Sequence, residues 1–358
     1  MQIEKAAYAF QMEGNPVSCV ELSQGHINRT LKITTDTGRE YVLQMINKYV
    51  FRNPIRLMGN ISAVTEYLQQ RVEDSRQAQH FIPTIKGTYY HRDRAGEFWR
   101  MSDYVGGFCL DAPERPEDFY QSALAFGRFQ QLLSDFPAEE LYETIPEFHN
   151  TIDRYRQFHA SVKLDPCDRV SQAQFEINYI LKQEKLAGTL QKMRESGELP
   201  LRVTHNDTKL NNVLLDKETR KALCVLDLDT VMPGLSAYDF GDAIRFGAAT
   251  AAEDEQDAGK MKLDIQLFQA FVRGFLEAAP SLTDKEVEVL PLGALTMTLE
   301  CGSRFLKDYL DGDVYFRTSY PTHNLIRCRT QMMLAKDMLA HWEEMGNIVK
   351  EIAVQVRG

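Results

Sequence analysis

The pattern of apolar and polar positions divides the chain into a strand-rich first third and a largely helical remainder. Residues 17–22, 28–35 and 40–46 have the β-branched and aromatic composition that is typical of strands. Residues 83–91 and 97–105 predict two more strands bounded by turn residues. Short turns favour antiparallel pairing, so we expect the first third to form an antiparallel sheet.

One helix interrupts this run of strands, and several more follow it. Residues 54–73 carry Leu57, Ile61, Val64 and Leu68 at helical spacing. The later segments that predict helices are 117–136, 141–162, 174–196, 236–247, 264–277 and 323–345, with a capping box at Thr283 and Glu286. The pattern as a whole therefore predicts an α+β protein.

Two adjacent glycines mark the expected boundary between the two parts. Gly106 and Gly107 directly follow the last predicted strand and allow the chain to change direction. We place a hinge at about residues 102–107. The chain of 358 residues is then expected to comprise an N-terminal lobe, residues 1–105, and a C-terminal lobe, residues 106–358.

The main group of reactive polar side chains lies within residues 202–245. Its members are His205, Asp207, Lys209, Asn212 and Asp227. Residues 211–215 and 222–228 predict two short strands around a turn, so the segment is expected to form a hairpin that holds these groups around one pocket. A polar turn explains any one of these residues alone, whereas the whole set in one hairpin points to a reactive site.

The spacing of this set resembles the catalytic loop of the kinase superfamily. There, an Asp is followed five residues later by an Asn and, beyond a hairpin, by a metal-binding Asp. The resemblance implies that Asp207 accepts the proton of the acceptor hydroxyl and that Asn212 and Asp227 hold Mg²⁺. Lys209 is placed to neutralise charge on the migrating phosphoryl group. ATP and Mg²⁺ are the implied cofactors.

A second tripeptide, Asp239-Phe240-Gly241, also spells a kinase metal motif, but we assign it a structural role. It follows Asn212 at twice the distance of Asp227 and lies inside a predicted helix. We expect Asp239 to hydrogen-bond the catalytic loop or to cap its helix.

The expected nucleotide site departs from the kinase pattern at one position. Gln44 occupies the place in the third strand where a kinase carries a lysine for the phosphates, so phosphate binding is expected to depend more on Mg²⁺ and Lys209. Glu66, in the N-lobe helix, then lacks a lysine partner and is expected on a solvated face. Gly25 is expected to place backbone amides over the phosphates. The backbone groups expected to face the adenine edge are those of Ser102, Asp103, Tyr104 and Val105.

Composition and charge argue against several classes of partner. The formal net charge is −10, whereas nucleic-acid phosphates are bound by basic surfaces. The six scattered cysteines include no C-x-x-C pair, which fits a reducing cytoplasm. The acidic N-terminal segment is unlike a signal peptide, and no stretch is apolar enough to span a bilayer. We expect a cytoplasmic monomer without nucleic-acid or membrane partners.

The length of the segment after Asp227 indicates a small acceptor. A protein kinase carries a long peptide-docking segment there, but in this chain residues 228–237 lead directly into the next predicted helix. The architecture resembles the aminoglycoside phosphotransferase and choline kinase group. This resemblance implies a bilobal protein-kinase-like fold, with a small N-lobe of antiparallel sheet and one main helix and a larger, mostly helical C-lobe over a small-molecule pocket.

Longer motifs are similar to those of the N-acetylhexosamine 1-kinases. They are GHIN at residues 25–28, ETIPEFHNT at 143–151, RVTHNDTKLNN at 202–212, DLDTVMPG at 227–234, YDFGDAIRFGA at 238–248, ECGSRFLKDYLDGDVYF at 300–316 and YPTHNLIRCRTQ at 320–331. Those enzymes transfer the γ-phosphoryl group of ATP to the anomeric hydroxyl of N-acetylglucosamine or N-acetylgalactosamine. The resemblance assigns the sugar pocket to His26, Asn28, Thr230, Arg245, Phe246, Arg304 and Tyr315.

Two other functions stay open. A neutral sugar needs hydrogen-bond donors and an aromatic wall, which this set offers, whereas a cationic acceptor needs an aromatic cage or an acidic cluster. Arg304 therefore argues against the first alternative, a kinase for an amine or amino alcohol of the choline or aminoglycoside type. The second alternative is an inactive kinase fold that acts as a binding module, for which Gln44 is the only support.

Overall fold

The computed structural model describes residues 4–22 and 28–358, so Gly25 and His26 lie outside the described residues. The chain forms two compact units. The first comprises Met1–Cys109, Glu139–Pro146 and Val213–Met232, and the second Leu110–Ala138, Glu147–Asn212 and Pro233–Gly358. The first unit thus continues beyond the expected hinge and gains two later segments of the chain.

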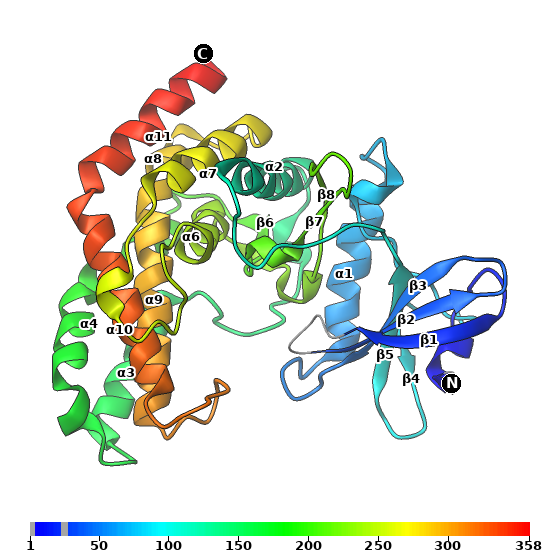
Figure 1. Cartoon of the computed structure of the whole chain (residues 1–358), viewed down its shortest axis with the longest axis horizontal. Helices are drawn as coiled ribbons and strands as arrows, with labels where there is room; N and C mark the ends of the chain where they lie inside the picture. Colours follow the sequence, from blue (N-terminus) through cyan, green and yellow to red (C-terminus); the bar gives the residue numbers. More distant parts are fainter. Residues whose placement is uncertain (1–3, 23–27) are drawn as a thin grey trace. The chain divides into compact units, whose positions relative to one another are not determined.

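The first unit contains an antiparallel sheet of five strands in the order β1-β2-β3-β5-β4 (Figure 1). Its strands are β1 (Pro16–Leu22), β2 (Arg29–Thr35), β3 (Glu40–Ile46), β4 (His91–Arg92) and β5 (Phe98–Asp103). The prediction of a strand over residues 83–91 is wrong apart from its last residue. Gly87 has a φ of 80° there, and its N–H donates to Thr84 O at 2.8 Å, so a turn replaces the ladder.

The two faces of this sheet differ in character. Leu31, Leu43 and Met101 point to one face and are buried in a core that also takes up residues of the short helix η1 (Lys5–Ala9). Directly opposite residues of antiparallel strands share a face, so Gln44 and Arg100, which pair across β3 and β5, lie together on the other face.

Helix α1 (Pro54–Gln69) follows the first three strands, as predicted. Asn53 caps it by accepting the N–H of Arg56 at 3.2 Å. The four apolar residues that predicted the helix, Leu57, Ile61, Val64 and Leu68, are all buried.

The predicted hairpin is confirmed as β7 (Val213–Leu215) and β8 (Ala222–Val225). Leu215 exchanges two backbone hydrogen bonds with Phe108, at 2.8 and 3.0 Å. A Cβ on Gly107 would lie 2.7 Å from the Leu215 carbonyl oxygen, so this close approach requires glycine. The segment Glu139–Pro146 is bonded to helix α1, because the Asn60 side chain donates to Tyr142 O at 2.7 Å.

The second unit is mostly helical. Its helices are α2 (Pro116–Leu132), α3 (Thr151–Leu164), α4 (Gln174–Ala187), α5 (Thr189–Glu195), α6 (Ser236–Gly247), α7 (Ile265–Ala278), α8 (Asp284–Glu288), α9 (Leu290–Leu310), α10 (His323–Ala340) and α11 (Trp342–Arg357). The short strands β6 (Arg202–Thr204) and β9 (Met232–Gly234) form a two-stranded sheet. Helix α9 packs against α3, α4, α6 and α10 (Figure 1).

The helical unit departs from the prediction in three places. The segment 174–196 is broken at Gly188, where a Cβ would lie 3.2 Å from a side-chain carbon of Ile152 on α3. The segment 323–345 is broken at His341. Helix α9 is absent from the prediction because it is buried on nearly every side, so it shows no polar face to reveal the helical period.

Glycine also explains why the Asp-Phe-Gly tripeptide has a structural role. Gly241 lies where α6 meets α9, and a Cβ there would be 2.2 Å from the carbonyl oxygen of Gly293. The same close approach makes a Cβ on Gly293 clash with Ala237 O at 2.3 Å. The fold is therefore α+β, as predicted, with an antiparallel N-terminal sheet and a larger helical part. No helix in the described ranges is both long and apolar enough to cross a membrane.

Candidate active site

A buried carboxylate on α6 holds the loop that follows β6. Asp239 is 1% exposed, and its two oxygens accept the backbone N–H groups of His205 at 2.9 Å and Asn206 at 2.8 Å. Gln130 donates to it at 2.8 Å. Burial raises the pKa of Asp239, and His205 and these donors oppose that rise. Asp239 thus hydrogen-bonds the loop that contains His205 and Asn206, which confirms the structural role predicted for it.

The same loop places Asp207 beside two other predicted residues. Lys209 Nζ lies 2.9 Å from Asp207 Oδ1. Asn212 Nδ2 donates to Asp207 Oδ2 at 3.1 Å and to the Asp207 carbonyl oxygen at 2.8 Å. The backbone N–H of Asp207 donates to His205 Nδ1 at 3.2 Å, and Asn206 has a φ of 63°. The second unit therefore brings together the predicted base, the predicted cation and one predicted metal ligand.

Lys209 is held in its charged form. The Asp207 carboxylate is the main cause of its raised pKa; burial opposes the rise and the Asp242 carboxylate adds to it. The Lys209 Nζ also lies 6.0 Å from the ring centroid of Phe246, a predicted sugar contact. A permanent cation therefore stands directly beside Asp207.

Asp242 also holds the loop that contains Asp207. Sequence analysis did not single out this residue. It accepts the backbone N–H of Thr208 at 3.1 Å and a guanidinium N–H of Arg245 at 2.9 Å. Burial alone would raise the pKa of Asp242, but the charges of Arg245 and Lys209 lower it overall. Arg245 also donates to Glu253 at 2.7 Å, so this predicted sugar contact already serves two carboxylates.

A buried pair from α9 and the start of α3 contacts the other side of the loop. His149 Nδ1 lies 2.9 Å from Glu300 Oε1, and His149 Nε2 lies 3.3 Å from the carbonyl oxygen of Asn206. Both partners are acceptors, so a ring nitrogen that carries a hydrogen donates to the partner it faces. Thr151 donates to the second Glu300 oxygen at 2.6 Å. The peptide that precedes Asp207 is thereby tied to the centre of the helical unit.

Glu300 is expected to make a pH-dependent contribution to stability. Burial alone would raise the Glu300 pKa, but His149 and Arg304 lower it below the ordinary 4.5. The carboxylate therefore stabilises the fold above about pH 4.5, and this contribution is lost as the pH falls through the lowered pKa. Glu300→Gln should reduce the free energy of unfolding at pH 7 by about 3–5 kcal/mol, and the deficit should narrow below pH 4.5.

Urea denaturation of both proteins between pH 3.5 and 7 measures this deficit. Glu288→Gln is a matched control, because it removes an exposed pair with Lys285 and should cost about 0–1 kcal/mol at every pH. A Glu300→Gln deficit that stays constant across the range would contradict the assignment.

Arg304, which lies on α9 with Glu300, is surrounded by three aromatic rings. Its guanidinium carbon lies 5.3 Å from the ring centroid of Phe148, 5.8 Å from that of Tyr315 and 5.6 Å from that of Phe316. Tyr315 is 63% exposed, and its backbone N–H donates to Asp308 at 2.8 Å. The structure thus brings the predicted residues Arg304 and Tyr315 together, with two further rings that sequence analysis did not assign.

The first unit contains the other predicted metal ligand. Asp227 follows β8 and precedes the short helix η6 (Leu228–Thr230), with a φ of 56°. Thr230, a predicted sugar contact, lies in the same turn. Asn28, another predicted sugar contact, donates to Asp229 at 2.6 Å and accepts the N–H of Asn47 at 2.9 Å. Its assignment to the sugar pocket therefore rests on resemblance alone.

The chemistry of Asn212 and Asp227 suits Mg²⁺. Asn212 commits its amide nitrogen to Asp207, and its carbonyl oxygen receives no hydrogen bond from any residue in the described part of the chain. Magnesium is commonly bound by one or two protein oxygens together with water and phosphate. Residues 4–22 and 28–358 contain no group of three or more His, Cys, Asp or Glu placed to hold a metal.

Some of the backbone N–H groups predicted to face adenine already donate hydrogen bonds within the protein. The N–H groups of Asp103 and Tyr104 donate to His80 O at 3.0 Å and Glu40 O at 3.1 Å. Ser102 pairs with Val42 within the sheet. Within the described ranges, the Val105 N–H donates to no other residue, so it is the donor of this set that a ligand would meet.

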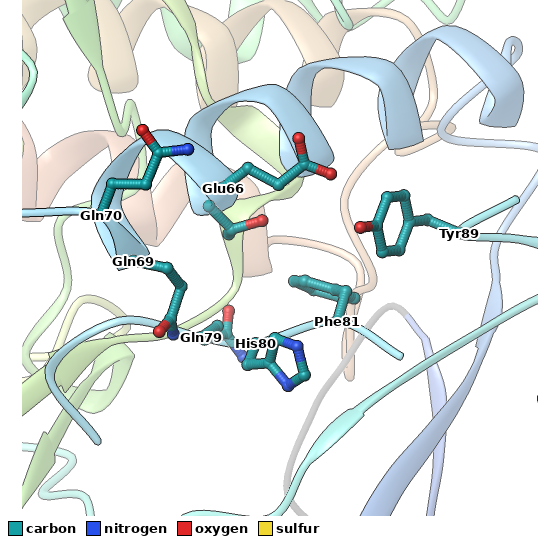
Figure 2. Close-up of a pocket in the computed structure, with 8 residues that line it drawn as sticks. Glu66, Gln69, Gln70, Gln79, His80, Phe81 and Tyr89 are labelled. Atoms are coloured by element: carbon teal, nitrogen blue, oxygen red, sulfur yellow. The ribbon is translucent and has the colours of Figure 1, made fainter. Parts of the chain in front are cut away.

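A cavity of about 280 Å³ lies in the first unit (Figure 2). Glu66, Tyr89, His80 and Phe81 are among its lining residues, and none of the predicted site residues lines it. The hydrogen bond to Glu66 raises the pKa of Tyr89, and a hydrogen bond to Asp103 raises that of His80. Glu66 therefore pairs with a tyrosine, and the cavity adjoins the predicted adenine-facing strand, because its lining residue His80 contacts Asp103 at 2.8 Å.

Sequence reasoning missed several residues that shape this site. Asp242 and Glu300 lie in apolar helical surroundings, and a carboxylate among buried positions was the available signal. The ion pair of Arg100 and Asp229 gave no signal, because these two residues meet only through folding across many residues of sequence.

Comparison with known proteins agrees with the fold. Residues 18–274 match the phosphotransferase enzyme family. An aminoglycoside phosphotransferase from Alicyclobacillus acidocaldarius is 14% identical, with 96% of this chain and 93% of that chain aligned at a TM-score of 0.63. A microcompartment-associated aminopropanol kinase is 16% identical over 96% and 97%, with a TM-score of 0.62. An amicoumacin kinase solved with AMP-PNP and Ca²⁺ is 13% identical over 92% and 91%, with a TM-score of 0.61.

Proposed function

Because the chain belongs to the phosphotransferase enzyme family, we propose that it transfers the γ-phosphoryl group of ATP to the anomeric hydroxyl of N-acetylglucosamine or N-acetylgalactosamine. ATP and Mg²⁺ are the expected cofactors. The observation that carries the acceptor assignment is the aromatic cluster around Arg304, which supplies a cation, hydrogen-bond donors and apolar ring faces. A neutral sugar with an acetamido arm matches that combination.

Each residue has a defined task in this proposal. Asp207 accepts the proton of the anomeric hydroxyl as that oxygen attacks phosphorus, and Lys209 offsets the negative charge that develops beside it. Asn212 and Asp227 would hold Mg²⁺, which neutralises phosphate charge. Phe246, Tyr315 and Thr230 would contact the sugar.

The nucleotide is assigned to the first unit. The Val105 N–H would meet the adenine edge. Gly25 and His26 keep their predicted roles at the phosphates and the sugar. Gln44 keeps its predicted place in the nucleotide site, where its amide also donates to Thr30 at 3.2 Å and accepts from Arg100 at 2.9 Å.

An amine or amino-alcohol acceptor is the competing proposal. The aminopropanol kinase shares the fold, which supports this alternative at the level of the fold alone. The position of Arg304 supports the sugar, because a second cation in that cluster would be repelled by the guanidinium.

A comparison of acceptors tests this choice. ADP release is measured with N-acetylglucosamine, N-acetylgalactosamine, choline, ethanolamine and 1-amino-2-propanol, and with the methyl glycoside of N-acetylglucosamine as the matched control. The proposal predicts turnover with the two free sugars and none with the methyl glycoside, which lacks the anomeric hydroxyl. Turnover with an amino alcohol alone would favour the competing proposal.

A further inference from the structure

A row of hydrogen-bonded side chains crosses the sheet on the face that carries Gln44 and Arg100. The row ends in a buried ion pair. Thr30, Gln44 and Arg100 lie directly opposite one another on β2, β3 and β5. Gln44 donates to Thr30 at 3.2 Å and accepts from Arg100 Nε at 2.9 Å. Arg100 Nη1 then donates to Asp229 Oδ1. One hydrogen-bonded chain therefore crosses three strands and reaches the turn that contains Asp227.

The turn that contains Asp229 is bonded to four other segments of the first unit. The Asp229 carboxylate accepts from Asn28 at 2.6 Å in addition to Arg100, and its carbonyl oxygen accepts from Thr144 at 3.0 Å. Asn60 of α1 donates to Val231 O in the same turn at 3.0 Å. The Arg100 and Asp229 side chains are each 3% exposed, so water does not screen their attraction.

We propose that the Arg100–Asp229 ion pair positions Asp227 for metal binding. This inference rests on the proposed function. Asp227 is two residues from Asp229 and adopts a left-handed conformation, φ 56°, which residues other than glycine, asparagine and aspartate rarely adopt. Such a turn persists only where its surroundings fix it, and the ion pair ties it to the sheet.

The two residues that form the corresponding ion pair in kinases cannot form it in this chain. In the kinase pattern the third-strand lysine pairs with the acid of the N-lobe helix. Here Gln44 occupies the lysine position, and Glu66 hydrogen-bonds Tyr89. Arg100 is therefore a positioning residue on the neighbouring strand. It contacts the metal-binding turn through Asp229 and is too buried to meet a phosphate itself.

Three variants separate positioning from simple stabilisation. Arg100→Gln and Asp229→Asn each leave one buried charge without its partner and should destabilise the fold. The double variant removes both charges and should recover most of the lost stability. It still lacks the ion pair that connects strand β5 to the turn containing Asp227. The inference predicts that the double variant still binds Mg²⁺ about 10–100-fold more weakly, the effect typical of losing an outer-shell partner.

The readout is Mg²⁺-dependent binding of fluorescently labelled ADP, with urea midpoints measured in parallel. Neither measurement depends on the acceptor. Arg202→Gln, which breaks the buried pair with Glu286 in the other unit, is the matched control and should lower stability without changing Mg²⁺ affinity. A double variant with the wild-type Mg²⁺ affinity would overturn the inference. Wild-type protein that binds the nucleotide without any effect of Mg²⁺ would instead overturn the proposed function.

Discussion

Replacing Asp207 by asparagine is expected to lower kcat by about 10²–10⁴-fold, because the loop then lacks the group that accepts the acceptor's proton. The asparagine retains the shape of the side chain. It also keeps an oxygen that can accept from Asn212, whose amide lies 3.1 Å from Asp207 Oδ2. Steady-state kinetics at saturating ATP, Mg²⁺ and acceptor measure the effect. The KM for the sugar should change far less than kcat.

The control for this substitution is structural. Asp207→Asn should unfold within a few degrees of the wild type, because Asp239 and Asp242 still hold the loop. A variant that keeps more than a tenth of the wild-type kcat would remove Asp207 from the role of base. If the wild type and the variant were equally inactive with every acceptor and bound nucleotide alike, the chain would be a binding module.

Replacing Asp227 by asparagine is expected to have the second-largest effect. Loss of a carboxylate ligand should weaken Mg²⁺ binding by more than the roughly 10–100-fold that loss of an outer-shell partner costs. Turnover should fall correspondingly at 1 mM Mg²⁺ and recover partly when Mg²⁺ is raised. A titration of Mg²⁺ at fixed ATP measures both quantities.

Asp216→Asn is the matched control for this prediction. Asp216 lies at the turn of the same hairpin, where it accepts the N–H of Thr219 at 2.9 Å, and asparagine can accept the same bond. Its Mg²⁺ dependence should equal that of the wild type. If Asp227→Asn behaved like Asp216→Asn, another residue would have to hold the metal.

The local parts of this fold could be predicted from the sequence. Strands β1, β2, β3 and β5, helix α1 and the β7–β8 hairpin each show their period or their turn residues directly. The role of Asp239 was also predictable, because its distance from Asn212 and its helical setting disagree with a metal ligand. The pattern of apolar positions reveals a helix or strand when only one face of that element is buried.

Features that depend on distant residues could not be predicted. Helix α9 is buried on nearly all sides, so it lacks a polar face, and the strand expected over residues 83–91 is replaced by a turn at Gly87. Asn28 shows the same limit for the site. Its motif predicts a sugar contact but gives no sign that its amide binds Asp229, 201 residues later in the chain.

The measurement that tests the central claim most directly is phosphorus NMR of the product formed from ATP, Mg²⁺ and N-acetylglucosamine. The account predicts a phosphomonoester signal coupled to the anomeric proton of the sugar, which appears as the γ-phosphate of ATP is consumed. It also predicts that Asp207→Asn abolishes this signal on the same timescale. A phosphoester on another sugar hydroxyl, or unchanged sugar beside a phosphorylated amino alcohol, would contradict it.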